Sequence, residues 1–107
     1  MTPRELFFAT NAERIKARVL PLQMDEVLMD GASAWAGQMF ASGRLRHDMS
    51  GGFAENIAWG QESIDEVIRV WMNSPGHRWN ILGSKYTKLG VGFCGEGHNM
   101  YWVQRFK

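Results

Sequence analysis

The chain of 107 residues contains a single cysteine, Cys94, so no disulfide can form within it and the fold must rest on packing. It also lacks any run of about 18 apolar residues, which excludes a membrane-spanning helix. Neither sign of charge is in excess, because 12 basic and 11 acidic side chains give a net charge of +1. We therefore expect no nucleic-acid partner and no binding to an acidic membrane surface.

The first residues do not have the pattern of a secretory leader. Residues 1–16 mix charged and apolar side chains, whereas a signal peptide has a short basic region followed by an apolar stretch. We expect no signal peptide in this sequence. A single cysteine does not indicate whether the protein works in an oxidising or a reducing compartment.

Large apolar side chains are abundant. Hydrophobic residues make up 45% of the chain and include five tryptophans and six phenylalanines. Each large aromatic side chain can remove about 150–250 Å² from water, which helps a short chain to form a stable core. The length and composition predict one domain over residues 1–107.

Helix-start signals occur twice in the first half. Residues 2–5 resemble a capping box with proline at the first helical position, and apolar residues then recur at helical spacing. This pattern predicts a helix over residues 3–18. Asp25 can cap a second helix, whose periodic apolar residues continue until Gly43.

The second half predicts two helices and a hairpin. Ser63 begins a capping box, and the pair Ser74-Pro75 can start another short helix. Alternating apolar residues over 89–93 and 102–106, separated by a glycine-rich turn, predict an antiparallel hairpin. Both faces of these strands carry apolar residues, so we expect helices on both sides of the sheet.

Two histidines and two glutamates form a candidate site: His47, Glu55, Glu66 and His77. Neutral imidazole binds zinc, and carboxylates either ligate the metal or orient its ligands and waters. His77 falls in the first turn of its helix, where the helix dipole favours the neutral ring. The spacing of the four residues matches no compact motif of the His-Glu-x-x-His kind.

Each of these residues also has a simpler explanation. Glu66 could complete the capping box that Ser63 begins, Glu55 could be a solvated turn residue, and both histidines could be ordinary polar residues. A further histidine, His98, lies in the glycine-flanked turn, where we expect an exposed side chain without a ligand role. We interpret Cys94 as an inert thiol.

A family resemblance favours the site. The sequence resembles the CAP superfamily, which unites cysteine-rich secretory proteins, venom antigen 5 and plant pathogenesis-related class 1 proteins, and it looks most like the short bacterial members. The resemblance includes Ala54-Glu55-Asn56-Ile57-Ala58 and Trp71-Met72-Asn73-Ser74-Pro75-Gly76-His77-Arg78. It extends to residues 11–14, 20–22, 80–82, 89–92 and 101–104.

The resemblance implies an α/β fold, a three-layer α-β-α sandwich with a small, mainly antiparallel sheet. It also implies a central cleft with a His-Glu-Glu-His tetrad, which by motif position falls on His47, Glu55, Glu66 and His77. On this interpretation a divalent cation, zinc, is held through the histidines. One departure from the family pattern is Ala54, because the family usually has glycine there.

Three functions follow as hypotheses. The first, which we favour, is a non-catalytic module that binds the cation and a small-molecule, lipid or peptide ligand. The second is a metal-dependent hydrolase, such as a peptidase, with Glu55 or Glu66 as general base. The third is a structural or interaction module in which the tetrad is a metal-free polar network.

The compartment is inferred from the resemblance alone. The relatives that it resembles imply a secreted or cell-envelope protein, whereas the expectation that no signal peptide is present leaves a cytoplasmic or particle-associated protein open. The sequence does not indicate an oligomeric state.

Overall fold

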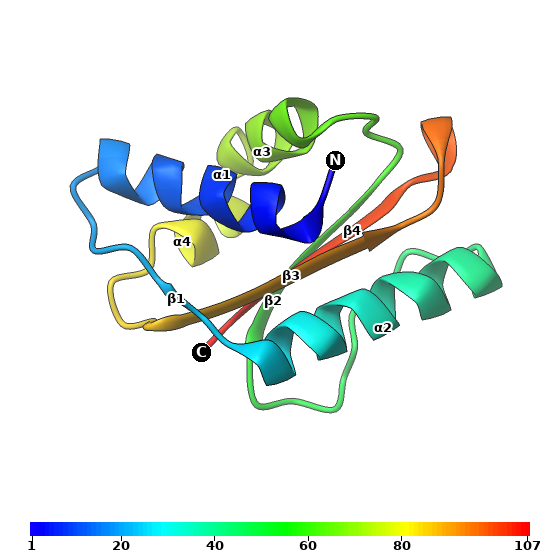
Figure 1. Cartoon of the computed structure of the whole chain (residues 1–107), viewed down its shortest axis with the longest axis horizontal. Helices are drawn as coiled ribbons and strands as arrows, with labels where there is room; N and C mark the ends of the chain where they lie inside the picture. The colour runs from blue at the N-terminus through cyan, green and yellow to red at the C-terminus, as the bar shows by residue number, and fades with distance from the viewer.

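A four-stranded sheet lies between two layers of helices in the computed structural model, which describes residues 1–107 (Figure 1). Helices α1 (Pro3–Lys16), α3 (Ile64–Met72) and α4 (Pro75–Ile81) cover one face of the sheet, and α2 (Glu26–Ser42) covers the other. This arrangement confirms the predicted α-β-α sandwich. No helix is both long and apolar enough to cross a membrane.

The sheet has the order β1-β3-β4-β2. Strands β3 (Lys88–Cys94) and β4 (Tyr101–Phe106) form the predicted hairpin, joined through a short 3₁₀ turn. Strand β2 (Ala54–Trp59) pairs antiparallel with β4 and forms one edge, and the two-residue β1 (Gln23–Met24) pairs parallel with β3. Neither edge strand was predicted from the sequence.

The helix-start signals are confirmed. The side chains of Thr2, Asp25 and Ser63 each accept a hydrogen bond from a backbone amide in the first turn of the helix that follows. The three distances are 3.2, 2.9 and 3.1 Å. Gly43 ends α2 in the left-handed conformation, with φ of 67°, which glycine adopts without strain.

Helix α1 departs from the prediction in its end and its buried side. It stops at Lys16 rather than residue 18, because Arg18 adopts a left-handed conformation with φ of 61°. Two of the apolar residues that predicted it, Phe8 and Ile15, are exposed. The buried residues include polar ones: Leu6, Phe7, Thr10, Asn11 and Arg14.

Arg14 explains why a polar side of α1 is buried. Its guanidinium group donates to the carbonyl oxygens of Leu20 at 2.7 Å, Ile81 at 2.8 Å and Gly83 at 2.9 Å. Burial lowers its pKa below the ordinary value, although an arginine remains charged at neutral pH. These bonds tie α1 to the end of α4, the helix that carries His77.

The core has two parts, one on each face of the sheet. The larger lies beneath α1, α3 and α4 and contains Trp71 and Trp102, and the smaller lies beneath α2. Helix α2 comes very close to β3 at Gly90 and Gly92. A Cβ atom at Gly92 would lie 2.6 Å from the Cα of Ser33, and one at Gly90 would overlap the backbone of Leu28.

Candidate functional site

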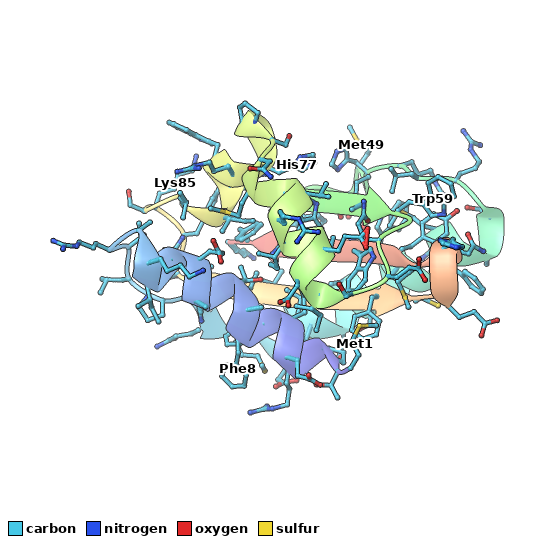
Figure 2. All side chains as sticks on the ribbon, turned by 90° about the horizontal axis from the view of Figure 1, so that it is seen from above. Met1, Phe8, Met49, Trp59, His77 and Lys85 are labelled. Carbon is cyan, nitrogen blue, oxygen red and sulfur yellow. The ribbon has the colours of Figure 1, made fainter.

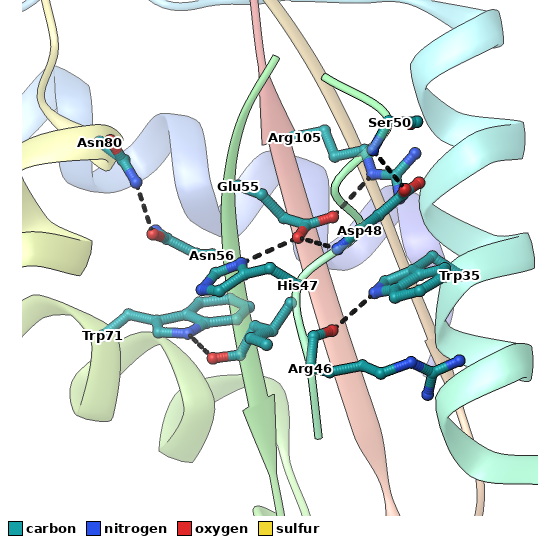
Figure 3. A network of polar contacts seen from close by, with 11 residues as sticks. Trp35, Arg46, His47, Asp48, Ser50, Glu55, Asn56, Trp71, Asn80 and Arg105 are labelled. Carbon is teal, nitrogen blue, oxygen red and sulfur yellow. Dashed lines mark hydrogen bonds and ion pairs between the residues drawn. The ribbon is translucent and has the colours of Figure 1, made fainter. Parts of the chain in front are cut away.

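His47 and Glu55 are in direct contact, as Figure 3 shows. Glu55 lies on β2, and His47 lies in the segment between α2 and that strand. The ring Nδ1 of His47 is 2.9 Å from Oε1 of Glu55. Because an ionised carboxylate only accepts hydrogen bonds, Nδ1–H is the donor, and in the neutral ring Nε2 keeps a free lone pair.

Glu55 is held firmly in the protein. Its side chain is 5% exposed, and its Oε1 also accepts from the backbone amide of Asp48 at 3.0 Å. Its Oε2 accepts from Nε of Arg105 at 3.1 Å. The structure therefore replaces the solvated-turn interpretation of Glu55 with a buried, fully oriented carboxylate on a strand.

Arg105 and Asp48 belong to this network, although the sequence reasoning missed both. Nη2 of Arg105 lies 2.9 Å from Oδ2 of Asp48, and the guanidinium group stacks 4.1 Å from the ring centre of Phe53. The pKa of Asp48 is lowered, chiefly because the Ser50 amide donates to it. Burial opposes this effect and Arg105 adds to it. The polar pair Gln104-Arg105 within a strand of large apolar residues was the signal available in the sequence.

His77 lies in the first turn of α4 and contacts Ser74. Its Nδ1 is 2.8 Å from Oγ of Ser74, whose side chain makes no capping bond to the helix backbone. The amide of Asn56 on β2 donates to the carbonyl oxygen of His77 at 3.0 Å and anchors α4 to the strand. Asn80 donates to the same Asn56 side chain, so the two asparagines form a second link between α4 and the strand.

The charge of His47 acts on His77. The pKa of His77 is lowered, first by burial and second by the charge of a protonated His47. Figure 2 shows His77 on the same side of the molecule as Met49, which follows His47 by two positions. His77 thus lies close enough to His47 for the charge of that ring to lower its pKa, and the neutral form of the His77 ring is favoured.

Glu66 lies in the first turn of α3. Its backbone amide donates to Ser63 Oγ, and its Oε1 accepts from the amide of Glu62 at 3.3 Å. This is the helix-capping role that was the simpler explanation for Glu66. No group of three or more histidine, cysteine, aspartate or glutamate side chains is arranged to hold a metal ion.

His98 and Cys94 occupy the positions expected for them. The side chain of His98 is 91% exposed and pairs with Oε2 of Glu62 at 2.9 Å, away from the site. Cys94 is a free, half-buried thiol that packs against the smaller core beneath α2.

The lowered pKa of His77 has a consequence for stability. Between its folded pKa and about 6.5, its ordinary value, the unfolded chain binds more protons than the folded one, so stability rises with pH there. We expect the contribution of His77 to be complete above about pH 6.5 and to be lost as the pH falls through the folded pKa. Urea unfolding between pH 7.5 and 5 should show a decline that is shallower in His77→Gln, and equal slopes in both proteins would contradict the assignment.

Comparison with known proteins supplies the family. The sequence profile of the CAP family, described as the cysteine-rich secretory protein family, matches residues 7–106. The uncharacterized protein YkwD of Bacillus subtilis is 40% identical over 113 residues, which cover 91% of this chain and 43% of that protein. The chain therefore spans less than half of this relative's length.

Solved structures agree with this result. An extracellular protein of Bacillus anthracis that contains an SCP domain is 27% identical, with a TM-score of 0.83 over 96% of this chain and 39% of that one. An outer surface protein of Borrelia burgdorferi has the same TM-score at 19% identity, over 96% and 89% of the two chains, which shows the shared fold. The profile match spans nearly the whole chain, and the chain belongs to the CAP family of cysteine-rich secretory proteins.

Proposed function

We propose that this CAP domain binds a divalent cation, zinc, through the Nε2 atoms of His47 and His77. The observation that carries the proposal is the hydrogen bonding of the two imidazole rings. Each ring has its Nδ1 within hydrogen-bond distance of a protein oxygen, at 2.9 Å from Glu55 and 2.8 Å from Ser74. This is the usual environment of a zinc-binding histidine, in which one nitrogen is oriented by a protein oxygen and the other ligates.

The two imidazole rings suit zinc, but they would fill only part of its coordination shell. Zinc accepts neutral imidazole nitrogen, and the low pKa of His77 favours that form near neutral pH. Ligation through Nε2 would select the tautomer in which Nδ1–H of His77 donates to Ser74. Two protein ligands leave coordination positions open, so the bound cation would supply an acceptor for water or for an anionic group of a ligand.

Glu55 supports this site indirectly, because it contacts the proposed metal ligand His47 and would not bind the cation itself. Arg105 and the amide of Asp48 hold its carboxylate, which in turn orients the ring of His47. Glu66 has no place in the proposed site, because its carboxylate caps α3. The four-residue tetrad thus reduces in this proposal to two ligands and one orienting carboxylate.

These contacts favour binding over hydrolysis. A general base must reach a bound water, but Oε1 of Glu55 already accepts two hydrogen bonds and Oε2 accepts one from Arg105. Glu66 is engaged at the start of α3. We propose a non-catalytic binding domain that acts outside the cell, as do the similar extracellular protein of Bacillus anthracis and outer surface protein of Borrelia burgdorferi.

Thermal unfolding with and without zinc tests this proposal. At pH 7.5 we expect zinc to raise the melting temperature of the natural protein, because ligand binding to the folded state stabilises it. The increase should vanish in His47→Ala and in His77→Ala, and it should fade at pH 5.5, where protons compete with the metal for imidazole.

His98→Ala is the matched control, because His98 also pairs with a glutamate at 2.9 Å but lies outside the proposed site. It should keep the full response to zinc. A response that persists in both site variants, or that disappears in the control, would refute the assignment of the two ligands.

A further inference from the structure

Trp79 differs from the other four tryptophans of the chain. The remaining four each donate their indole N–H to a protein oxygen at 2.9–3.1 Å: Trp35 to Arg46, Trp59 to Asn99, Trp71 to Ile57 and Trp102 to Gln61. Trp79 has no such partner, and its side chain is 75% exposed. A large aromatic group in this state contributes little to the fold, and its ring face and N–H are available to a ligand.

A cavity of about 590 Å³ lies next to this indole. Pro75, Trp79 and Leu82 supply apolar surface to it, and Arg78, Ser84 and Lys85 supply polar groups. Its volume is within the range of about 300–1,000 Å³ that is typical of small-molecule sites. The cavity is therefore large enough for a ring-sized ligand beside an aromatic wall.

The charged side chains that line the cavity, Arg78 and Lys85, are both positive. Neither Arg78 nor Lys85 forms an ion pair, and no acidic residue lines the cavity. Behind the wall, the buried Arg14 donates to the carbonyl oxygen of Gly83. Lys85 has its ammonium group 5.3 Å from the ring centre of Tyr86, a contact that leaves its charge without an acidic partner. The polar side chains of the cavity therefore present hydrogen-bond donors and positive charge, which are complementary to an anion.

The cavity and His77 occupy different sides of α4. Residues 75, 78, 79 and 82 follow the three- and four-residue spacing that places side chains on one face at the end of this helix. His77 does not fall in that series and instead contacts Ser74. Figure 2 likewise shows His77 and Lys85 at separate positions along the molecule. The cavity is thus distinct from the histidine pair.

We propose that this cavity binds a small anion carried on a flat ring. The ring would stack on the indole of Trp79, and a carboxylate or phosphate group on it would be bound by Arg78 and Lys85. The indole N–H and the hydroxyl of Ser84 complete the set of donors. This site requires no metal and stands independently of the zinc proposal.

A titration with phenyl phosphate, followed by ¹H–¹⁵N NMR, tests the proposal. We expect the indole N–H signal of Trp79 to shift in a saturable manner, together with the amides of Arg78 and Lys85. The other four indole signals should stay in place. Benzyl alcohol, which lacks the charge, and inorganic phosphate, which lacks the ring, should each bind at least about tenfold more weakly.

Two variants separate the contribution of the aromatic ring from that of the positive charge. Trp79→Ala, followed through the two amides, and Arg78→Gln should each weaken phenyl phosphate binding about tenfold, because each removes one recognition element. Arg46→Gln is the matched control: Arg46 also lies beside a tryptophan, at 4.8 Å from the ring centre of Trp35, but outside the cavity. It should bind like the natural protein.

Three results would overturn the proposal. One is the absence of any saturable shift at Trp79 with millimolar phenyl phosphate. Another is equal binding of the neutral or ring-free compound, which would remove the anion or the ring from the recognition. The third is unchanged affinity in both cavity variants. Because both substituted side chains are exposed, unfolding is not expected to obscure the comparison.

Discussion

Replacing Gly90 with alanine is expected to lower the free energy of unfolding by about 3 kcal/mol, because the added methyl group would overlap the backbone of Leu28. A flexible side chain could move aside, but the backbone of α2 cannot yield without separating the helix from β3. Urea denaturation, followed by circular dichroism, measures the loss.

Gly37→Ala provides the matched control. Gly37 lies within α2, and a Cβ atom there would meet nothing within 4 Å. Alanine is the better helix former, so this variant should be more stable by about 0.5–1 kcal/mol. A loss below about 1 kcal/mol for Gly90→Ala would show that α2 does not depend on the close approach to β3.

Arg105→Met is expected to cost about 3–5 kcal/mol, because it removes the cation from two carboxylates that remain in place. The side chain of Arg105 is 7% exposed, and it bonds to Glu55 at 3.1 Å and to Asp48 at 2.9 Å. Methionine restores much of the volume but none of the charge. Urea denaturation at pH 7.5 checks the expectation.

The same change at Arg46 separates charge loss from the loss of stacking. Both arginines stack on an aromatic ring, but Arg46 has no carboxylate partner and bonds to the hydroxyl of Ser42. Arg46→Met should cost less than about 1 kcal/mol. Equal losses in the two variants would mean that the ion network around Glu55 contributes nothing beyond ordinary packing.

The sequence predicted the helices well, because their start signals are local. The side chains of Thr2, Asp25 and Ser63 bond within their own first turns, so neighbouring residues suffice to identify them. Strand β2 escaped prediction since Glu55 and Asn56 resemble a polar turn. Their partners lie far away in sequence, as in the bond from Arg105 to Glu55 across 50 positions.

The same contrast of local and distant partners applies to the site. The sequence and the family resemblance proposed His47, Glu55 and His77; in the structure His47 contacts Glu55, and the charge of His47 acts on His77. Glu66 could not be separated from them by pattern alone, because the capping motif and the family motif coincide at that residue. The contact between Asp48 and Arg105, which lie 57 positions apart, is visible only in the folded chain.

The buried polar side of α1 has a similar origin. Arg14 is satisfied by the carbonyl oxygens of Ile81 and Gly83, which lie more than sixty positions away along the chain. A hydrophobic pattern predicts that such a residue is exposed to solvent. Here the carbonyl oxygens of Leu20, Ile81 and Gly83 accept hydrogen bonds from the guanidinium group, which allows it to be buried. The arginine thereby fixes α4, on which both the histidine pair and the Trp79 cavity depend.

The central claim is that the Nε2 atoms of His47 and His77 bind one cation together. The most direct test is long-range ¹H–¹⁵N NMR of the histidine side chains during a zinc titration at pH 7.5. We expect the Nε2 signals of both residues to move together and to saturate at one zinc per chain, while those of His98 stay unchanged. Movement of only one of the two, of neither, or of His98 to the same extent would contradict the claim.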